Sequence, residues 1–504
     1  MKRFIVILLL IPSLVFGTYT EFYCISGGSQ INAGSTTSTT AAYTSTSGNW
    51  STVTNIFTPT DGSTPASTVA VNDYVDVYAN GATAPGCIRK VTAVGAGVNG
   101  TITTSATVTI GTCPSTASGT RSIKAGGAML GPSAADTWPF TSGTAWAGMA
   151  NSAGDQVRIN VKNNQTYTVT TTLSLPSSVI VQGYTTTVGD GGRATFTTST
   201  AGSSMFNSAA NASVFDLEIA STASSSNAFG ISGASNSNCN YVRLVIHGWR
   251  GAGLVAGTQS NIIEVEAYDN NKGNTSTSGQ DSGIVAQTGC KVFSCYSHDN
   301  TGSNANGFST ANTVGDIFVN CIADSNGKDG FRVDTVSALG NFALIGCDSY
   351  NNGGDGINLA GQTAGSISTV WIQNCNLIKN TGKGINKSST ATIQGYVYNC
   401  GYGSGTQANS GGDSALGSLI ESGKITYASN VTPYSAPTTG NFSNVLAAAQ
   451  GVGRSFFLET DGTNTGTVGF PDIGAAQANI GVPFPTPTAT PTATPVQTSY
   501  AFPQ

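Results

Sequence analysis

Short segments with alternating apolar and polar residues recur along the middle of the chain. In the copy around Cys347, the side chains of Ile345, Cys347 and Ser349 point one way, and Gly346 and Asp348 point the other. A period of two residues predicts β-strands rather than helices. Four copies can be laid over one another: FSCYSHDN (293–300), VNCIADSN (319–326), IGCDSYNN (345–352) and QNCNLIKN (373–380).

These segments return at a nearly constant spacing. A column of cysteines marks intervals of 26, 26, 28 and 25 residues at Cys295, Cys321, Cys347, Cys375 and Cys400. Repeats of this length form stacked coils, because one coil cannot bury its apolar side alone. A glycine before Leu, Ile or Phe recurs once per coil and suits the bend that opens the next strand. The pattern predicts a parallel β-solenoid over residues 151–425.

An asparagine stands five residues after the cysteine position in most copies. Parallel strands stack about 4.8 Å apart, so these side-chain amides are expected to lie above one another and bond along the stack. We interpret this ladder as structural. Its members are Asn270, Asn300, Asn326, Asn352 and Asn380, with Trp249 in the same position one coil earlier.

The repeat, the glycine bends and the segment DQVRINVKNNQTYTVTTTLSLPSSVIVQG (155–183) together resemble the right-handed parallel β-helix of the pectin-lyase-like superfamily. The resemblance covers about residues 155–425. It implies an all-β right-handed parallel β-helix, here with a small β-rich N-terminal domain, and an extracellular polysaccharide or cell-surface glycan as partner. FFLETDGTNTGTVGFPDIGAAQ (456–477) resembles the closing segment of extracellular bacterial members of this fold.

The flanking regions lack the repeat. Residues 1–17 have two basic residues, an apolar run and a small final residue, which predicts a signal peptide and a secreted or cell-surface protein. Residues 18–150 contain short alternating strands such as 73–79, 88–94 and 100–110, typical of an antiparallel β domain. We expect residues 426–482 to cap the solenoid and the Pro/Thr-rich residues 483–504 to form an extended tail.

Composition narrows the range of partners. Only 9% of the residues are charged, the net charge is −5 and the sequence pI is about 5.0, which argues against nucleic acid as a partner. No stretch is long and apolar enough to predict a membrane span. The cysteine column predicts buried free thiols, since column neighbours point the same way, whereas Cys87 and Cys113 are candidates for a disulfide.

Acidic residues and both histidines of the chain gather on one side of about five consecutive coils. Glu264 and Glu266 stand two apart, about 6.5–7 Å along a strand, close to the carboxyl separation of inverting glycosidases. His298 beside Asp324 in the next coil forms a second candidate acid/base pair. The predicted catalytic residues are Glu264, Glu266, His298 and Asp324, and the predicted sugar-binding residues are Arg243, Tyr268, Tyr296, Asp269 and Asp299.

Other interpretations stay open. Asp216, Arg243 and Glu264 are successive in one column and could form an ion-pair ladder, while Asp269, Asp299 and Asp324 could cap turns. The polygalacturonase and pectate lyase motifs of this fold have no full match, so the sequence leaves lyase, hydrolase and a non-catalytic adhesin or structural protein as alternatives, with a tail-spike-like glycan-binding protein as a further one. We predict no cofactor or bound metal; Ca²⁺ has no specific motif. A monomer is favoured over a trimer, because the outward columns offer no apolar seam.

Overall fold

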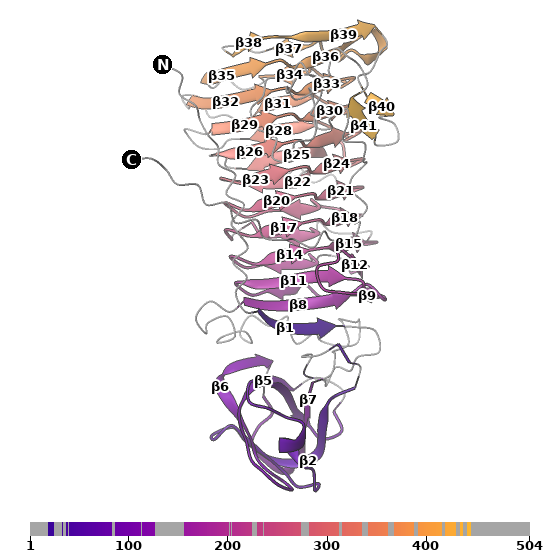
Figure 1. Cartoon of the computed structure of the whole chain (residues 1–504). Helices are drawn as coiled ribbons and strands as arrows, with labels where there is room; N and C mark the ends of the chain where they lie inside the picture. Colours follow the sequence, from indigo (N-terminus) through magenta and orange to yellow (C-terminus); the bar gives the residue numbers. More distant parts are fainter. Residues whose placement is uncertain are drawn as a thin grey trace, which may run out of the picture.

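The computed structural model describes residues 19–24, most of 33–126 and most of 156–444. Three long parallel sheets wind into a solenoid, with a small antiparallel barrel at one end (Figure 1). The expectations for residues 1–17, for 456–477 and for the tail lie outside the described residues, as does most of the insertion at 270–283. Within the described part, no helix has the length and apolar character of a membrane span.

The first sheet of the solenoid, sheet 1, has 12 strands. In spatial order they are β1 (Tyr19–Cys24), β8 (Gln156–Lys162), β11 (Val179–Tyr184), β14 (Ser213–Phe215), β17 (Asn240–Val242), β20 (Asn261–Ile263), β23 (Lys291–Phe293), β26 (Asp316–Val319), β29 (Asn341–Ile345), β32 (Ile367–Gln373), β35 (Thr392–Tyr398) and β38 (Ile420–Ser422). Its first strand therefore comes from the range expected to belong to the N-terminal domain.

The second sheet, sheet 2, has 11 strands and carries the candidate site. They are β9 (Thr166–Thr168), β12 (Ala194–Thr198), β15 (Leu217–Ser221), β18 (Val245–His247), β21 (Glu266–Tyr268), β24 (Tyr296–His298), β27 (Ile322–Asp324), β30 (Asp348–Tyr350), β33 (Asn376–Ile378), β36 (Gly401–Ser404) and β39 (Ile425–Ser429). A 3₁₀ helix, η3 (Gly405–Gln407), follows β36.

The third sheet, sheet 3, has 10 strands and closes each coil. They are β10 (Leu173–Leu175), β13 (Phe206–Ser208), β16 (Ile231–Ser232), β19 (Leu254–Val255), β22 (Ser282–Gln287), β25 (Asn306–Ala311), β28 (Phe331–Asp334), β31 (Ile357–Ala360), β34 (Ile385–Asn386) and β37 (Ser414–Ala415). The two strands β40 (Tyr434–Ala436) and β41 (Asn441–Asn444) pair separately as an antiparallel ribbon.

The chain turns between sheets through residues in the left-handed backbone region. Arg243 (φ 53°) and Glu264 (φ 54°) each stand between a strand of sheet 1 and a strand of sheet 2. Asp269 (φ 54°) and Asp299 (φ 49°) follow strands of sheet 2 in the same conformation. Asparagine, aspartate and glycine tolerate this region best, which explains part of their abundance in the repeat.

The core of the solenoid follows the predicted columns. The five cysteines of the column are buried free thiols, as predicted, and pack with aliphatic and aromatic residues in one continuous cluster. The asparagine ladder is also confirmed: the Asn326 amide donates to Asn352 Oδ1 at 2.9 Å, and the Asn352 amide donates to Asn380 Oδ1 at 2.9 Å. The ladder extends one coil further than predicted, to Asn409. Each amide group thus gives the buried amide oxygen of the next coil a hydrogen-bond donor.

The N-terminal domain is a closed antiparallel barrel. Its strands are β2 (Tyr43–Ser51), β3 (Ile56–Pro59), β4 (Tyr74–Ala79), β5 (Cys87–Val94), β6 (Ile102–Gly111) and β7 (Ala117–Ala125), with a 3₁₀ helix, η1 (Pro65–Ser67). Tyr74 packs edge-on against Phe22 of the first solenoid strand, with ring centroids 5.2 Å apart. Ile88 joins the solenoid core. The barrel thereby covers the N-terminal end of the solenoid, a role the sequence suggested for 138–140, which lie outside the described residues.

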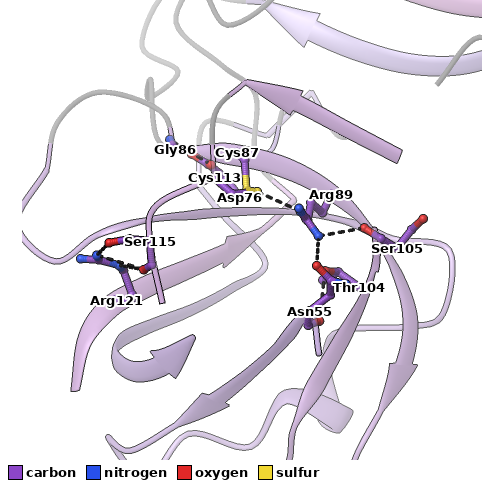
Figure 2. Close-up of a disulfide and its surroundings, with 10 residues drawn as sticks. All are labelled: Asn55, Asp76, Gly86, Cys87, Arg89, Thr104, Ser105, Cys113, Ser115 and Arg121. Carbon is purple, nitrogen blue, oxygen red and sulfur yellow. Dashed lines mark hydrogen bonds between the residues drawn. A yellow bond between two sulfur atoms is a disulfide. The ribbon is translucent and has the colours of Figure 1, made fainter. Parts of the chain in front are cut away.

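A disulfide joins Cys87 to Cys113 in the barrel, as the sequence suggested (Figure 2). The Arg89 Nε donates to Cys113 Sγ at 2.9 Å, and its guanidinium lies 5.4 Å from the Trp50 ring centroid. The bond therefore ties β5 to the residues between β6 and β7.

Reduction of this disulfide is expected to destabilise the barrel by about 2–4 kcal/mol, because it releases a loop in the unfolded chain. The cysteines are 26 residues apart. Cys87→Ala/Cys113→Ala should show the loss in chemical denaturation followed by Trp50 fluorescence. Cys347→Ala is the matched control, since it removes a buried thiol from the solenoid and should leave the barrel transition unchanged. An unshifted barrel transition in the double variant would contradict the expectation.

The outer face of sheet 1 carries an apolar column that the sequence analysis did not consider. The side chains of this column lie in register at the end of each strand, and several of them are only half-buried. The preference for a monomer rested on other outward columns and stays a prediction. The column contains Phe215, Val242, Ile263, Phe293, Val319 and Ile345.

Candidate functional site

The candidate site is the outer face of sheet 2 between β15 and β27. The three-residue strands β18, β21, β24 and β27 place their first and last residues outward and their middle residue in the core, because side chains alternate along a strand. The longer β15 places Glu218 outward between the buried Leu217 and Ile219. The first outward column therefore runs through Glu218, Val245, Glu266, Tyr296 and Ile322. The second, in register, runs through His247, Tyr268, His298 and Asp324.

Aromatic rings stack along the second column. The His247 and Tyr268 centroids are 4.7 Å apart with planes inclined by 7°, and Tyr268 and His298 are 5.1 Å apart at 16°. Tyr296 also stacks on His298, with centroids 4.1 Å apart. The rings therefore cover one another's faces, and only their edges and polar atoms point outward from the sheet. Tyr268 and Tyr296 were expected to stack on sugar rings or to hold hydroxyls; only the second role fits this arrangement.

Two histidines on this face are each bonded to a glutamate of the strand before. His247 Nε2 lies 3.1 Å from Glu218 Oε1, and His298 Nε2 lies 3.2 Å from Glu266 Oε1. His298 Nδ1 lies 2.9 Å from Asp299 Oδ2 as well. Burial alone would lower the pKa of His298, but its hydrogen bonds with the Glu266 and Asp299 carboxylates raise it above its ordinary value. His298 is thus hydrogen-bonded between two carboxyl groups, which favour its protonated form.

Asp324 is the buried acid of the face. Its Oδ2 accepts a hydrogen bond from the Tyr296 hydroxyl at 3.2 Å, and its Oδ1 accepts one from Ser325 Oγ at 2.8 Å. Burial raises the pKa of Asp324 to about 6, and the nearby Asp299 carboxylate adds to the rise. A carboxyl with such a pKa keeps its proton closer to neutral pH than an ordinary aspartate does, as a general acid requires.

Glu264 and Arg243 do not join this group. The expectation that Glu264 and Glu266 share one face of a straight strand is wrong, because Glu264 stands in the left-handed turn between β20 and β21. Arg243 occupies the same corner one coil earlier. Its Nε donates to Asp216 Oδ1 at 2.5 Å and its second nitrogen to Oδ2 at 2.8 Å. The ion-pair ladder left open by the sequence is thus present for Asp216 and Arg243.

Asp269 stands at the other corner of the coil and bonds to Lys272 at 2.6 Å. Asp299 occupies the equivalent turn one coil later, but its carboxylate reaches His298. Of the predicted site residues, the structure therefore brings six together: Glu266, Tyr268, Tyr296, His298, Asp299 and Asp324. Among the described residues, no group of three His, Cys, Asp or Glu side chains could hold a metal ion.

Sequence reasoning missed two parts of this face. Glu218 and His247 were assigned to the acidic cluster but not to the site, although they repeat the Glu266–His298 pair two coils earlier. The shared spacing from the Leu244 and Cys295 positions could have revealed that repeat. The tyrosines Tyr427 and Tyr434, which cover the far end of the face, carried no local signal.

Stability is expected to fall as the pH rises from about 4 to 8. Burial raises the pKa of Asp316 to about 7 and that of Asp324 to about 6, so the folded protein holds these protons more tightly than the unfolded chain. This contribution is fully present below the unfolded pKa near 4 and is lost as the pH passes the folded values. The pKa values of Asp61 and Asp190 are lowered to about 2, so these residues affect the pH dependence of stability only below this pH range.

Denaturant titrations at pH 5 and pH 8 should show a loss of roughly 2 kcal/mol at the higher pH. Asp316→Asn should flatten this dependence, because Asp316 Oδ1 accepts from the Cys290 amide at 2.7 Å and a neutral amide preserves that bond. A protein that is more stable at pH 8, or an unchanged slope in Asp316→Asn, would contradict the assignment.

Comparison with known proteins returns solved structures alone: no protein-family model and no curated protein matches the chain. The chain is similar to the A-module of the mannuronan C-5 epimerase AlgE4 of Azotobacter vinelandii, at 16% identity over 55% of this chain and 82% of that one (TM-score 0.41). It is similar to pectate lyase Pel9A, at 16% identity over 67% of this chain and 92% of that one (TM-score 0.38).

A Dettilon tailspike protein also matches, at 13% identity over 54% of this chain (TM-score 0.41), and the match spans 56% of the tailspike's own length. No conclusion about this chain is drawn from likeness at this level. The sheet order of this chain is by itself that of a parallel β-solenoid, as its sequence pattern predicts.

Proposed function

We propose that this protein binds a neutral extracellular polysaccharide along the outer face of sheet 2 and hydrolyses it there. One observation carries the proposal: a row of alternating Glu–His pairs and tyrosine edges ends at Asp324, an acid that keeps its proton to about pH 6. Strand spacing repeats these polar groups about every 4.8 Å, a spacing that suits a polymer with hydroxyls on every unit.

The polar tips of the row supply both donors and acceptors. The Tyr268 hydroxyl lies between the two Glu–His pairs and has no hydrogen-bond partner among the described residues. Glu266 uses one carboxylate oxygen for His298, which leaves the other to accept from a sugar hydroxyl. Side chains that are half-buried and fixed by neighbours bind with little loss of entropy.

The charge of the face favours a neutral chain over an acidic one. Glu218, Glu266 and Asp299 are carboxylates around the single raised-pKa cation, His298. An anionic polysaccharide would be repelled by this excess of negative charge. β-Elimination needs a carboxylate on the sugar, so hydrolysis is the cleavage that matches a neutral chain.

In this reaction Asp324 would donate its proton to the glycosidic oxygen as the bond breaks. A carboxylate would take a proton from the attacking water, as in glycosidases that use two carboxyl groups. Glu266 and Asp299 are the candidates for that role, because His298 holds both in place. His298 then acts as a positioning residue rather than as the acid/base partner of Asp324 that its sequence position suggested.

The binding half of the proposal is tested with neutral and acidic polysaccharides by affinity electrophoresis. Tyr268→Phe removes one hydroxyl and should weaken binding of a neutral chain by about 5–30-fold, the cost of an unmade hydrogen bond. Lys291→Gln, on the outer face of sheet 1, is the matched control and should bind as the parent does. If Tyr268→Phe and Glu266→Gln both bind glycan as the parent does, the glycan site lies elsewhere. If the parent binds no glycan, there is no such site. Either result would favour the non-catalytic alternative.

A further inference from the structure

The outer face of sheet 2 becomes covered toward its C-terminal end. His247 and His298 are partly exposed. Further along the same column the residues are buried, with exposed fractions of 7% for Asp324, 4% for Tyr350 and 0% for Ile378. All five positions point outward in one column of the sheet, so the last ones are buried by something that lies on this face.

The cover consists of two tyrosines near the end of the described chain. Tyr427 stands in β39, the last strand of sheet 2, and Tyr434 opens β40. Tyr427 donates a hydrogen bond to Asn376 of β33, and Tyr434 donates one to Asp348 of β30 at 2.9 Å. Both rings belong to an apolar cluster with Tyr350 and Ile378. Figure 1 shows β40 and β41 beside the solenoid at the level of these strands. The two tyrosines thus lie over strands of sheet 2 that precede them in the chain.

Local sequence makes room for this cover. A Cβ at Gly401 would lie 2.4 Å from the Tyr427 hydroxyl and 2.6 Å from Asn376 Oδ1, closer than real side chains allow. The Tyr350 and Tyr434 rings meet edge to face, with centroids 5.8 Å apart, a favourable geometry for aromatic pairs. The cover is therefore a packed and hydrogen-bonded wall, and Asp324 lies next to its edge.

We infer that this wall makes the site bind the end of a glycan chain rather than an internal stretch. The inference rests on the proposed function. A polysaccharide that follows the row from Glu218 to Asp324 meets Tyr434 one strand later. To continue, it would have to displace two packed rings and break the hydrogen bonds that they donate to the buried Asp348 and Asn376 side chains, which is costly. The chain therefore ends at the wall, with its terminal glycosidic bond beside Asp324.

The wall is assigned to Tyr427 and Tyr434, which become specificity-determining residues. Tyr434 bonds to Asp348, which lies in the first column next to Ile322. Asp324, the proposed acid, lies in the second column next to Tyr350. The effect of the two tyrosines is to decide where the glycan stops, and thus whether short products or random fragments are released.

The test measures the binding of β-glucan and mannan that have been separated by size. Each polymer is used at chain lengths from about ten to a hundred sugar units, so that the number of internal binding positions varies while the number of chain ends stays constant. If chain ends are bound, affinity per mole of polymer stays constant with length, and a cyclic glucan without ends competes poorly. If internal stretches are bound, affinity per mole rises in proportion to length and the cyclic glucan competes as well as a linear one. The second result would overturn the inference and leave the proposed function standing.

Variants separate the wall from other causes. Tyr434→Ala removes the ring over Asp348 and should make affinity per mole rise with length, whereas Tyr434→Phe keeps the ring and should behave as the parent does. Thermal unfolding confirms that both variants fold, and the length series of the parent decides the inference even where one does not. Failure of every linear preparation to bind would contradict the proposed function itself, and the inference falls with it.

Discussion

Asp324→Asn is expected to lower the rate of glycan hydrolysis by about 10²–10⁴-fold while glycan affinity stays within a few-fold. Asparagine keeps the size of the side chain; its Oδ1 can still accept from one of the Tyr296 and Ser325 hydroxyls and its amide nitrogen can donate to the other, but it has no acidic proton to give to a leaving group. The variant therefore removes one chemical function and leaves the packing in place. Initial rates of reducing-end release, compared with affinity measured separately, give the two quantities.

The pH profile adds a second readout for the same residue. Because burial raises the pKa of Asp324 to about 6, the rate of the parent should fall on the alkaline side as this carboxyl loses its proton. Glu264→Gln is the matched control, since Glu264 stands in a corner turn away from the row. Equal rates for the parent and Asp324→Asn on a polymer that is cleaved would remove Asp324 from the mechanism.

Arg243→Asn is expected to destabilise the solenoid by about 3 kcal/mol, because it leaves the fully buried carboxylate of Asp216 without its cation. Asparagine is the right replacement, since Arg243 has a φ of 53° and most other residues would add backbone strain. Asp216 would keep only a hydrogen bond from Gln182 Nε2 at 3.4 Å. Urea unfolding gives the loss.

The double variant Arg243→Asn/Asp216→Asn should recover much of this loss, because it removes the stranded charge as well as its partner. Glu264→Asn, in the same corner one coil later, is the control for backbone effects and should change stability by no more than about 0.5 kcal/mol. A loss in glycan affinity at unchanged stability would instead restore the sugar-binding role that the sequence suggested for Arg243.

The sequence was most informative where each coil repeats the same environment. The cysteine column and the asparagine ladder each place one residue type in one buried position, so their period reveals the coil and its strands. The barrel strands could be predicted from alternation alone. The outward order of Tyr268, His298 and Asp324 also followed from the period, because register is fixed once the inward residues are known.

The corner between sheets 1 and 2 could not be read in the same way. Apolar and polar residues alternate in the sequence from Ile263 to Glu266, and this alternation hides the left-handed residue at Glu264. Asn320, Gly346 and Asn374 occupy the same corner in later coils, and these residue types favour positive φ. That composition was the available signal. The wall could not be inferred, because Tyr434 meets Asp348 across 86 residues without any repeat.

The row that ends at Asp324 is expected to bind and cleave a neutral glycan. The most direct measurement incubates the purified protein and Asp324→Asn with a panel of neutral and acidic polysaccharides, with and without Ca²⁺, and follows new reducing ends and the absorbance of unsaturated uronates. We expect reducing ends from a neutral polymer in the parent alone, without unsaturated products. Unsaturated products from an acidic polymer, or no cleavage across the panel while a glycan still binds, would contradict this expectation.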